Sequence, residues 1–433
     1  MNREAIKVFV RPHPMLAKET ELCQVDTANQ QLVFDCRPYK FDGVFGCDVS
    51  QSTVFDTCVL PMIASVQKGY NATLFAYGQS GSGKTYTMCG MDEGQAGVIP
   101  RVAASLIVNA DCEVSLSIFE IYRERVQDLL APADQEPLDK MQLPRLYDLI
   151  TTVPLGRSPE KFGAHFRKAL SARKVADTKL NDRSTRSHMV TVFHVTHGET
   201  LGHLYCVDLS GNEDLRLSGA EGKTGEEARA INLSLFTLSR VVSQQNARMN
   251  EGKKQVHVPY RDSVLTTILS ESIGGNSMTA FIVNIREHPE FSQRSLRFGQ
   301  QLRTIRTTPH VNLHLSVEEW RRKCDQLQKR LVRVEMENQI LRDYILVEKK
   351  LPLPAALGNL GSGFSSITSA HAENLEIEMD DPPVSGLFIQ AVEDRVQKPR
   401  LREQMEKCMM KIAFLQNKFF TMSNNENISG SSV

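Results

Sequence analysis

The stretch GYNATLFAYGQSGSGKTYTM, residues 69–88, decides the fold of this chain. It passes from an apolar, strand-like segment into a loop that matches G-x-x-x-x-G-K-[ST] and then into a helix-compatible segment. In such a loop, glycines let successive backbone N–H groups face a phosphate, the lysine neutralises the outer phosphates and the last hydroxyl ligates Mg²⁺. A Gly- and Ser-rich surface turn is the alternative, but the flanking strand and helix favour a phosphate-binding loop. It comprises Gly78, Gln79, Ser80, Gly81, Ser82, Gly83, Lys84 and Thr85, and Tyr86 follows it.

The composition excludes several classes of protein. The 51 basic and 51 acidic residues balance, so a polyanionic partner must be met by a local patch. The nine cysteines are an odd number without a C-x-x-C pair, which argues against a disulfide framework or a zinc site and favours reduced cytosolic thiols. No segment approaches eighteen consecutive apolar residues, so neither secretion nor membrane spanning is indicated.

The chain changes character once, near residue 308. Before it, short apolar strand candidates alternate with helical stretches, the pattern of a layered α/β domain. After it, residues 316–350 are charged and heptad-patterned, and residues 351–396 are rich in Pro, Gly, Ser and acidic side chains. Residues 398–422 regain a helical apolar repeat, and the last residues have the composition of a disordered tail.

The phosphate loop alone fits a kinase, a GTPase, an ATPase pump or a motor. Two further stretches distinguish between these classes of protein. VDLSGNE places Asp208 at the end of an apolar strand and Gly211 three residues later. In this D-x-x-G arrangement a carboxylate reaches the Mg²⁺ shell and a glycine N–H meets a γ-phosphate. LNDRSTRSH, residues 180–188, supplies hydroxyls and an arginine suited to grasping phosphate and Mg²⁺. Either stretch alone could be a solvated turn.

Together these motifs closely resemble the kinesin motor domain. FAYGQSGSGKTYTM, GVIPR, EIYRERVQDLL, NDRSTRSH, DLSGNE, EARAINLSL, VPYRDSVLT and GGNSMT occur in the family's order, and the resemblance covers residues 1 to about 310. It implies a P-loop NTPase motor domain over residues 1–308, with a central mostly parallel sheet and helices on both faces. It also implies ATP and Mg²⁺ as cofactors and microtubules as partner.

The resemblance assigns roles to residues of this chain. The catalytic group it implies is Lys84, Ser184, Thr185, Arg186, Gly211 and Glu213, with Arg186 and Glu213 forming a salt bridge that closes the two switch loops around ATP. Asn181 and Ser187 join the phosphate loop and Tyr86 in holding the nucleotide. Thr85, Thr185 and, through water, Asp208 would hold Mg²⁺. Thr185 stands where the family usually has serine and keeps the hydroxyl.

The same resemblance places the adenine against Arg11, Pro14 and Tyr77. The usual R-x-R-P reads R-x-H-P here because His13 replaces an arginine. Base stacking should survive this change, while the outer edge of the base loses a cation.

The surface that should meet acidic tubulin has lost several cations. Lysines of the family are replaced by Leu233, Val264 and Met278, and an arginine by Thr267. Arg261 remains, and Lys253 and Lys254 lie in a loop between two expected helices, where they could equally be a solvated pair. Fewer cations predict a weaker and more salt-sensitive grip on the track.

Residues 309–316 resemble a neck linker, and 317–350 the neck coiled coil of conventional transport kinesins. Ser316 and Glu319 form a capping box, and about four heptads follow, with Asn338 at an a position favouring two strands. A parallel homodimer is therefore expected, the alternative being a single helix packed on its own motor. Residues 351–396 should be a flexible linker, 397–423 a second short helical or coiled-coil segment and 424–433 a disordered tail.

The sequence thus predicts a microtubule-stimulated ATPase that moves towards microtubule plus ends as a homodimer, in the cytoplasm and on the cytoskeleton. No nucleic-acid partner and no membrane insertion are expected, and the cargo is not indicated. The rival interpretation is a kinesin-like microtubule-binding or scaffold protein that hydrolyses slowly and does not walk. A generic P-loop GTPase is a more distant alternative, because no base-reading N-K-x-D follows DLSGNE.

Overall fold

The computed structural model describes residues 3–19, 21–90, 94–109, 111–132, 134–180, 186–213, 223–250 and 257–313, and six helical residues between 322 and 334. Contacts divide the chain into two units, Met1–His314 and Leu315–Val433. The predicted neck helix is represented by those six residues, and the segments predicted after residue 350 lie outside the described residues. Within the described part, no helix is long and apolar enough to cross a membrane.

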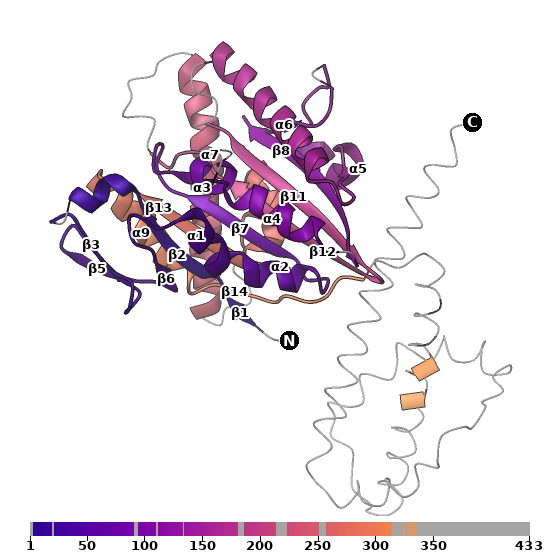
Figure 1. Ribbon diagram of the computed structural model, residues 1–433, viewed down its shortest axis with the longest axis horizontal. Coiled ribbons are helices and arrows are strands. Elements are labelled where there is room, and N and C mark those ends of the chain that lie inside the picture. The colour runs from indigo at the N-terminus through magenta and orange to yellow at the C-terminus, as the bar shows by residue number, and fades with distance from the viewer. Residues whose placement is uncertain are drawn as a thin grey trace, which may run out of the picture. The chain divides into compact units, whose positions relative to one another are not determined.

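The first unit is built on one large sheet (Figure 1). Its strands run in the order β10 (Val153–Pro154), β8 (Glu113–Tyr122), β11 (His188–His197), β12 (Thr200–Asp208), β7 (Ala72–Tyr77), β13 (Met278–Ile285), β2 (Lys7–Pro12) and β6 (Gly43–Val44), and β9 (Arg125–Asp128) pairs with β8. The half from β12 to β6 is parallel, whereas the half from β10 to β12 is antiparallel.

The expectation of a mostly parallel sheet is therefore corrected to a mixed sheet. The physical reason is the hairpin between β11 and β12, which pairs His197 with Thr200 across a two-residue turn. Gly198 opens that turn at φ 54°, a left-handed conformation that glycine adopts without steric cost.

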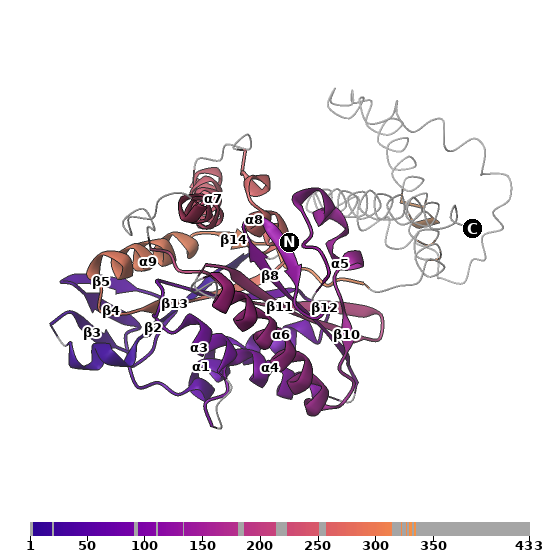
Figure 2. The same cartoon turned by 90° about the horizontal axis from the view of Figure 1, so that it is seen from above.

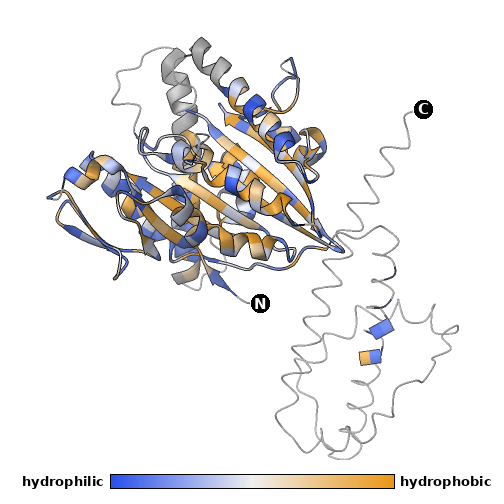
Figure 3. Cartoon of the chain, in the orientation of Figure 1, coloured by the Kyte–Doolittle hydropathy of each residue, from blue (hydrophilic) through white to orange (hydrophobic). Residues whose placement is uncertain are grey.

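Helices cover both faces of the sheet, as expected, and Figure 2 shows the layers edge-on. One face packs against α1 (Gln51–Cys58), α2 (Leu60–Val66), α3 (Lys84–Cys89), α4 (Val98–Ile107) and α6 (Pro159–Leu180). The other packs against α5 (Leu146–Leu149), α7 (Lys223–Asn250), α8 (Val264–Ile268) and α9 (Pro289–Leu302). Because both faces are covered, the central strands are mostly apolar, and hydrophobic colour predominates in them in Figure 3.

Short elements complete the unit. The 3-10 helices are η1 (Pro14–Lys18), η2 (Lys140–Arg145), η5 (Tyr260–Asp262) and η6 (Ser270–Ser272). A three-stranded antiparallel sheet contains β3 (Cys23–Asp26), β4 (Gln31–Phe34) and β5 (Arg37–Lys40). A two-stranded sheet pairs β1 (Glu4–Ala5) with β14 (Arg306–Thr307).

The segment after β14 continues along the first unit. Val311 forms a bridge with Tyr70, and Leu313 with Thr200. The Asn312 side chain donates to the carbonyl oxygens of Gly69 and Leu201 at 3.1 and 3.2 Å. Residues 309–313, the described part of the predicted neck linker, are thus attached across the end of the sheet at which β7 and β12 begin.

Candidate nucleotide site

The loop predicted to bind phosphate connects β7 to α3, at the end of the sheet where the parallel strands β7 and β12 terminate. Gly78 has φ 153°, and a Cβ there would lie 2.2 Å from the carbonyl oxygen of Asn284 on β13. Gly83, with φ 95°, is the residue before α3. Glycine is therefore required at these positions, and the loop can turn its backbone N–H groups inward at the start of a helix.

Lys84 is buried at the base of this loop. Its ammonium donates to the carbonyl oxygens of Gly78 at 2.9 Å and Gln79 at 2.8 Å. Burial lowers the pKa of Lys84, and the neighbouring carboxylates of Asp208 and Glu213 oppose that shift. The cation is thus held inside the loop, where it can compensate phosphate charge.

Asp208 at the end of β12 and Thr85 in α3 meet across the site. The Thr85 hydroxyl donates to Asp208 Oδ2 at 2.8 Å. The other carboxylate oxygen, Oδ1, is buried and has no hydrogen-bond partner among the residues that the structure describes. The same holds for the buried Gln79 Oε1 and Ser82 Oγ of the loop. An oxygen-only donor set with an orphaned carboxylate oxygen fits Mg²⁺, so the residues present suit the predicted cofactor.

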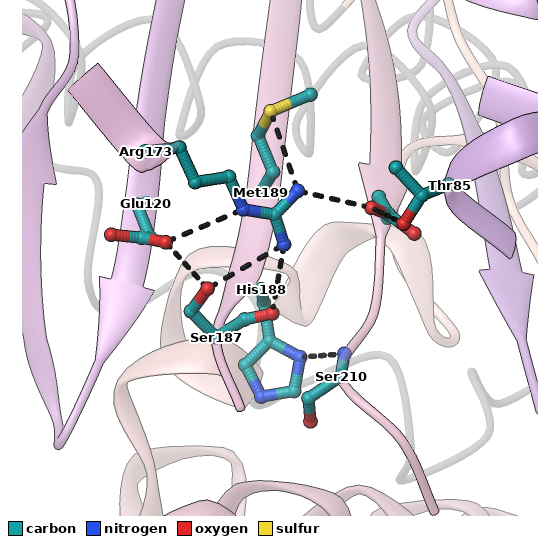
Figure 4. A network of polar contacts seen from close by, with 8 residues as sticks. Thr85, Glu120, Arg173, Ser187, His188, Met189 and Ser210 are labelled. Atoms are coloured by element: carbon teal, nitrogen blue, oxygen red, sulfur yellow. Dashed lines mark hydrogen bonds and ion pairs between the residues drawn. The ribbon is translucent and has the colours of Figure 1, made fainter. Parts of the chain in front are cut away.

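A buried arginine that sequence reasoning missed holds Asp208 in place (Figure 4). Arg173 on α6 contacts Asp208 Oδ2 through Nη1 at 3.2 Å and Glu120 Oε1 on β8 through Nε at 3.4 Å. Burial works against the charge of Arg173, but the two carboxylates outweigh it and raise its pKa. The Ser187 hydroxyl donates to the Glu120 carboxylate, and the Ser187 carbonyl accepts from Arg173 at 3.3 Å.

His188 is a second residue absent from the predicted site. Its Nδ1 accepts from the backbone N–H of Ser210 at 3.0 Å, and its Nε2 lies 2.8 Å from the hydroxyl of Ser234 on α7. Burial, with Arg173 and Lys84 nearby, lowers the pKa of His188 to about 3. The neutral ring therefore connects β11, the segment after β12 and α7.

The loop after β12 reaches the phosphate loop directly. The Glu213 carboxylate accepts from the backbone N–H of Ser80 at 2.8 Å and from the Ser80 hydroxyl. Gly211 lies between Asp208 and Glu213 in the sequence. Arg186 is described and half-buried, and its pairing with Glu213 stays a prediction.

Arg11 and Pro14 are two of the three residues expected around the adenine. Arg11 is buried, donates to Gln51 Oε1 at 2.7 Å and Thr87 Oγ1 at 2.9 Å, and lies 5.3 Å from the centre of the Tyr86 ring. Pro14 is exposed at the start of η1.

Tyr77 does not lie where the prediction needs it. Its ring is buried against Phe298 of α9, with centroids 4.5 Å apart, on the sheet face opposite to α3. Tyr86, which is 45% exposed, is instead the aromatic residue beside Arg11.

The remaining predicted positions divide as follows. Asn181, Ser184 and Thr185 lie outside the described residues, as do Lys253 and Lys254. Arg261 is exposed in η5, on the face of the sheet that carries α7 and α8.

Comparisons with known proteins agree with this geometry. The family model of the kinesin motor domain matches residues 4–305. The kinesin heavy chain of Syncephalastrum racemosum is 36% identical over 349 residues, which cover 74% of this chain and 37% of that protein. The human kinesin heavy chain isoform 5A is 34% identical, over 75% of this chain and 33% of its own length. The chain thus spans about a third of the length of these relatives.

Solved structures show the same similarity. A structure of a fast kinesin is 33% identical with a TM-score of 0.61, over 72% of this chain and 95% of that one. A KIF14 dimer with AMP-PNP in complex with a microtubule is 28% identical with a TM-score of 0.60, over 72% of this chain and 97% of that one. The Drosophila family member NOD, in complex with manganese and ADP, is 25% identical with a TM-score of 0.55, over 70% of this chain and 98% of that one.

Proposed function

Since the chain belongs to the kinesin motor family, we propose that it is a microtubule-stimulated ATPase that uses ATP hydrolysis to move towards microtubule plus ends. Its cofactors are ATP and Mg²⁺, its track is the cytoplasmic microtubule and residues 317–350 form a homodimer. The KIF14 dimer in complex with a microtubule and AMP-PNP supports the choice of track, and the NOD complex with manganese and ADP supports the choice of cofactors.

The proposal rests mainly on direct hydrogen bonds from the phosphate loop to the end of β12 and to the segment after β12. Thr85 donates to Asp208, and Ser80 donates twice to Glu213. A change at the outer phosphate of a bound nucleotide therefore acts on residues 208–213 without an intermediary. From there, His188 continues the connection to α7 through Ser234.

Each polar group has a separate task in hydrolysis. Lys84 would compensate the charge of the outer phosphates, and Thr85 and Asp208 would hold Mg²⁺, which would supply charge neutralisation at the transferred phosphoryl group. Arg173 holds the Asp208 carboxylate in place through an ion pair at 3.2 Å. Glu213, released from Ser80, would pair with Arg186 and position the attacking water.

The direction of movement rests on the segment after β14. Residues 309–313 contact Gly69 and Leu201 at the end of the sheet where β7 and β12 begin. An N-terminal motor that attaches this segment when ATP binds would carry the following residues towards the plus end, as the resemblance to transport kinesins implies.

A slow, non-walking microtubule-binding protein is the second candidate. It is favoured by the lost cations of the track surface, because Leu233, Val264, Thr267 and Met278 all stand where the resemblance expects a positive charge. The hydrogen bonds made by Lys84, Thr85, Asp208 and Glu213 argue against this second candidate.

Microtubule gliding on surface-bound protein with polarity-marked microtubules tests nucleotide use, track and direction together. We expect ATP-dependent gliding with minus ends leading, and no gliding or turnover for Lys84→Ala. Binding without movement, at a turnover that microtubules do not stimulate, would establish the second candidate instead. Minus-end-directed motion would overturn the assigned direction alone.

A further inference from the structure

Two exposed apolar side chains lie on the outward face of α7, within the part of the helix whose side chains are described. Leu233 is 41% exposed and Phe236 is 61% exposed. Leu235 and Leu238, on the opposite side of this helix, are buried in the core. Continuing at helical spacing, the same outward face carries Arg240, Ser243, Gln244 and Arg248.

Leu233 differs from the other three positions at which the track surface lost a cation. Val264 is fully buried, and its backbone N–H donates to Glu124 at 2.7 Å. Thr267 is half-buried, and its hydroxyl donates to the backbone carbonyls of Tyr260 and Ser263; Met278 is half-buried at the start of β13. The side chains at these three positions are buried or half-buried, whereas Leu233 places an exposed apolar side chain where a lysine is expected.

The surroundings of this pair are basic. No acidic residue occurs between Leu233 and Asn250. Arg240 lies 6.0 Å from the centre of the Phe236 ring and pairs with Asp262 of η5 at 2.8 Å, both side chains remaining about half-exposed. Arg261, next to Asp262, is also exposed. An apolar pair with an arginine rim is the composition of an interface centre rather than of an ordinary solvated helix face.

We propose that Leu233 and Phe236 form an apolar anchor through which α7 binds the microtubule, with Arg240, Arg248 and Arg261 as its cationic rim. The proposal rests on the proposed function, which supplies the track. The acidic surface of tubulin complements the rim, and burial of the two apolar side chains replaces the attraction of the lost cations. Because hydrophobic burial is not screened by salt, this contact should resist salt that weakens a lysine-based contact.

Co-sedimentation of the full chain with stabilised microtubules and AMP-PNP tests the anchor. We expect Phe236→Ala to raise the dissociation constant roughly tenfold and Leu233→Ala roughly threefold to fivefold, in line with the area each exposes. Val108→Ala is the matched control, since Val108 is 83% exposed at the end of α4 on the opposite face of the sheet. It should bind as the wild type does. Circular dichroism establishes that each variant is folded.

A charge swap separates apolar from electrostatic binding. Leu233→Lys should bind well at about 0.01 M salt but lose more affinity than the wild type at about 0.1 M, as the Debye length contracts from about 30 Å to about 10 Å. Equal affinity of wild type, Phe236→Ala and Leu233→Ala would overturn the anchor while leaving microtubule binding intact. Tighter binding of the alanine variants would also overturn it and would indicate that the pair is covered by another part of this chain. Failure of the wild type to bind would refute the proposed function itself.

Discussion

Replacement of Arg173 by methionine should destabilise the first unit strongly, because it removes the guanidinium that pairs with two buried carboxylates, those of Glu120 and Asp208. The side chain of Arg173 is 4% exposed, and those of Glu120 and Asp208 are 1% exposed. Methionine keeps the length and much of the apolar stem, so the change removes charge and hydrogen bonds more than volume.

The magnitude follows from the distances. At an effective dielectric constant of about 20, charges 3.2 to 3.4 Å apart attract by about 5 kcal/mol per pair. Desolvation of all three groups offsets much of this attraction. Breaking a buried pair by removal of one partner typically costs about 3–5 kcal/mol, and we expect a loss in this range.

Urea unfolding of the full chain followed by circular dichroism measures this loss. Arg294→Met is the matched control, because Arg294 pairs with Glu290 at 2.7 Å but both side chains are about half-exposed or more, so about 0.5 kcal/mol is expected. The double variant Arg173→Met with Glu120→Gln should recover part of the loss, since it removes one of the two stranded charges. A loss below about 1 kcal/mol for Arg173→Met, or strict additivity in the double variant, would refute the reasoning.

Three further outcomes are expected. Glu213→Ala should keep ATP binding yet hydrolyse orders of magnitude more slowly, because the carboxylate bonded to Ser80 belongs to the water-positioning group; a parallel fall in binding, measured with a fluorescent nucleotide, would contradict this role. His194 has its pKa lowered from 6.5 to about 3 by burial and then by a neighbouring histidine, so it contributes stability above pH 6.5 that is lost as pH falls towards 3. His194→Asn should reduce the slope of unfolding free energy in that window by up to about 1.4 kcal/mol per pH unit, and an unchanged slope in pH-dependent urea unfolding would count against it. Asn312→Ala should speed hydrogen exchange at Leu201, whose N–H donates to the Asn312 carbonyl at 3.1 Å, and equal protection in both proteins would show that the side chain does not hold the segment.

The phosphate loop could be predicted from sequence because all of its chemistry lies within eight consecutive residues. Lys84 and Thr85 lie as predicted at the start of α3, and Asp208 lies at the end of β12. Arg173 and Glu120 could not be assigned to the site in this way, because they are 35 and 88 residues from Asp208 in the chain. Arg173 belongs to none of the quoted motifs, and Glu120 begins EIYRERVQDLL, which does not itself point to Asp208. Only the packing of α6 and β8 around β12 brings them together.

Two errors have a common physical origin. A strand buried on both faces is apolar at every position, so its sequence does not tell which side chain faces which layer. Tyr77 ends such a strand, and its ring points to α9 rather than to Arg11. The apolar sequence of such a strand also does not tell whether it pairs parallel or antiparallel with its neighbour. The short turn at Gly198 between two strand-like segments was a signal for the antiparallel half of the sheet.

The attachment of residues 309–313 also determines how the first unit would respond to mechanical load. Its contacts are met one after another along the chain, first the bridge from Leu313 to Thr200, then the bonds of Asn312, then the bridge from Val311 to Tyr70. A pull on the chain end directed away from the body therefore breaks them singly, and the greatest resistance is that of Asn312 alone. A pull parallel to the segment strains all of them together, so the same bonds withstand much more force in one direction than in the other.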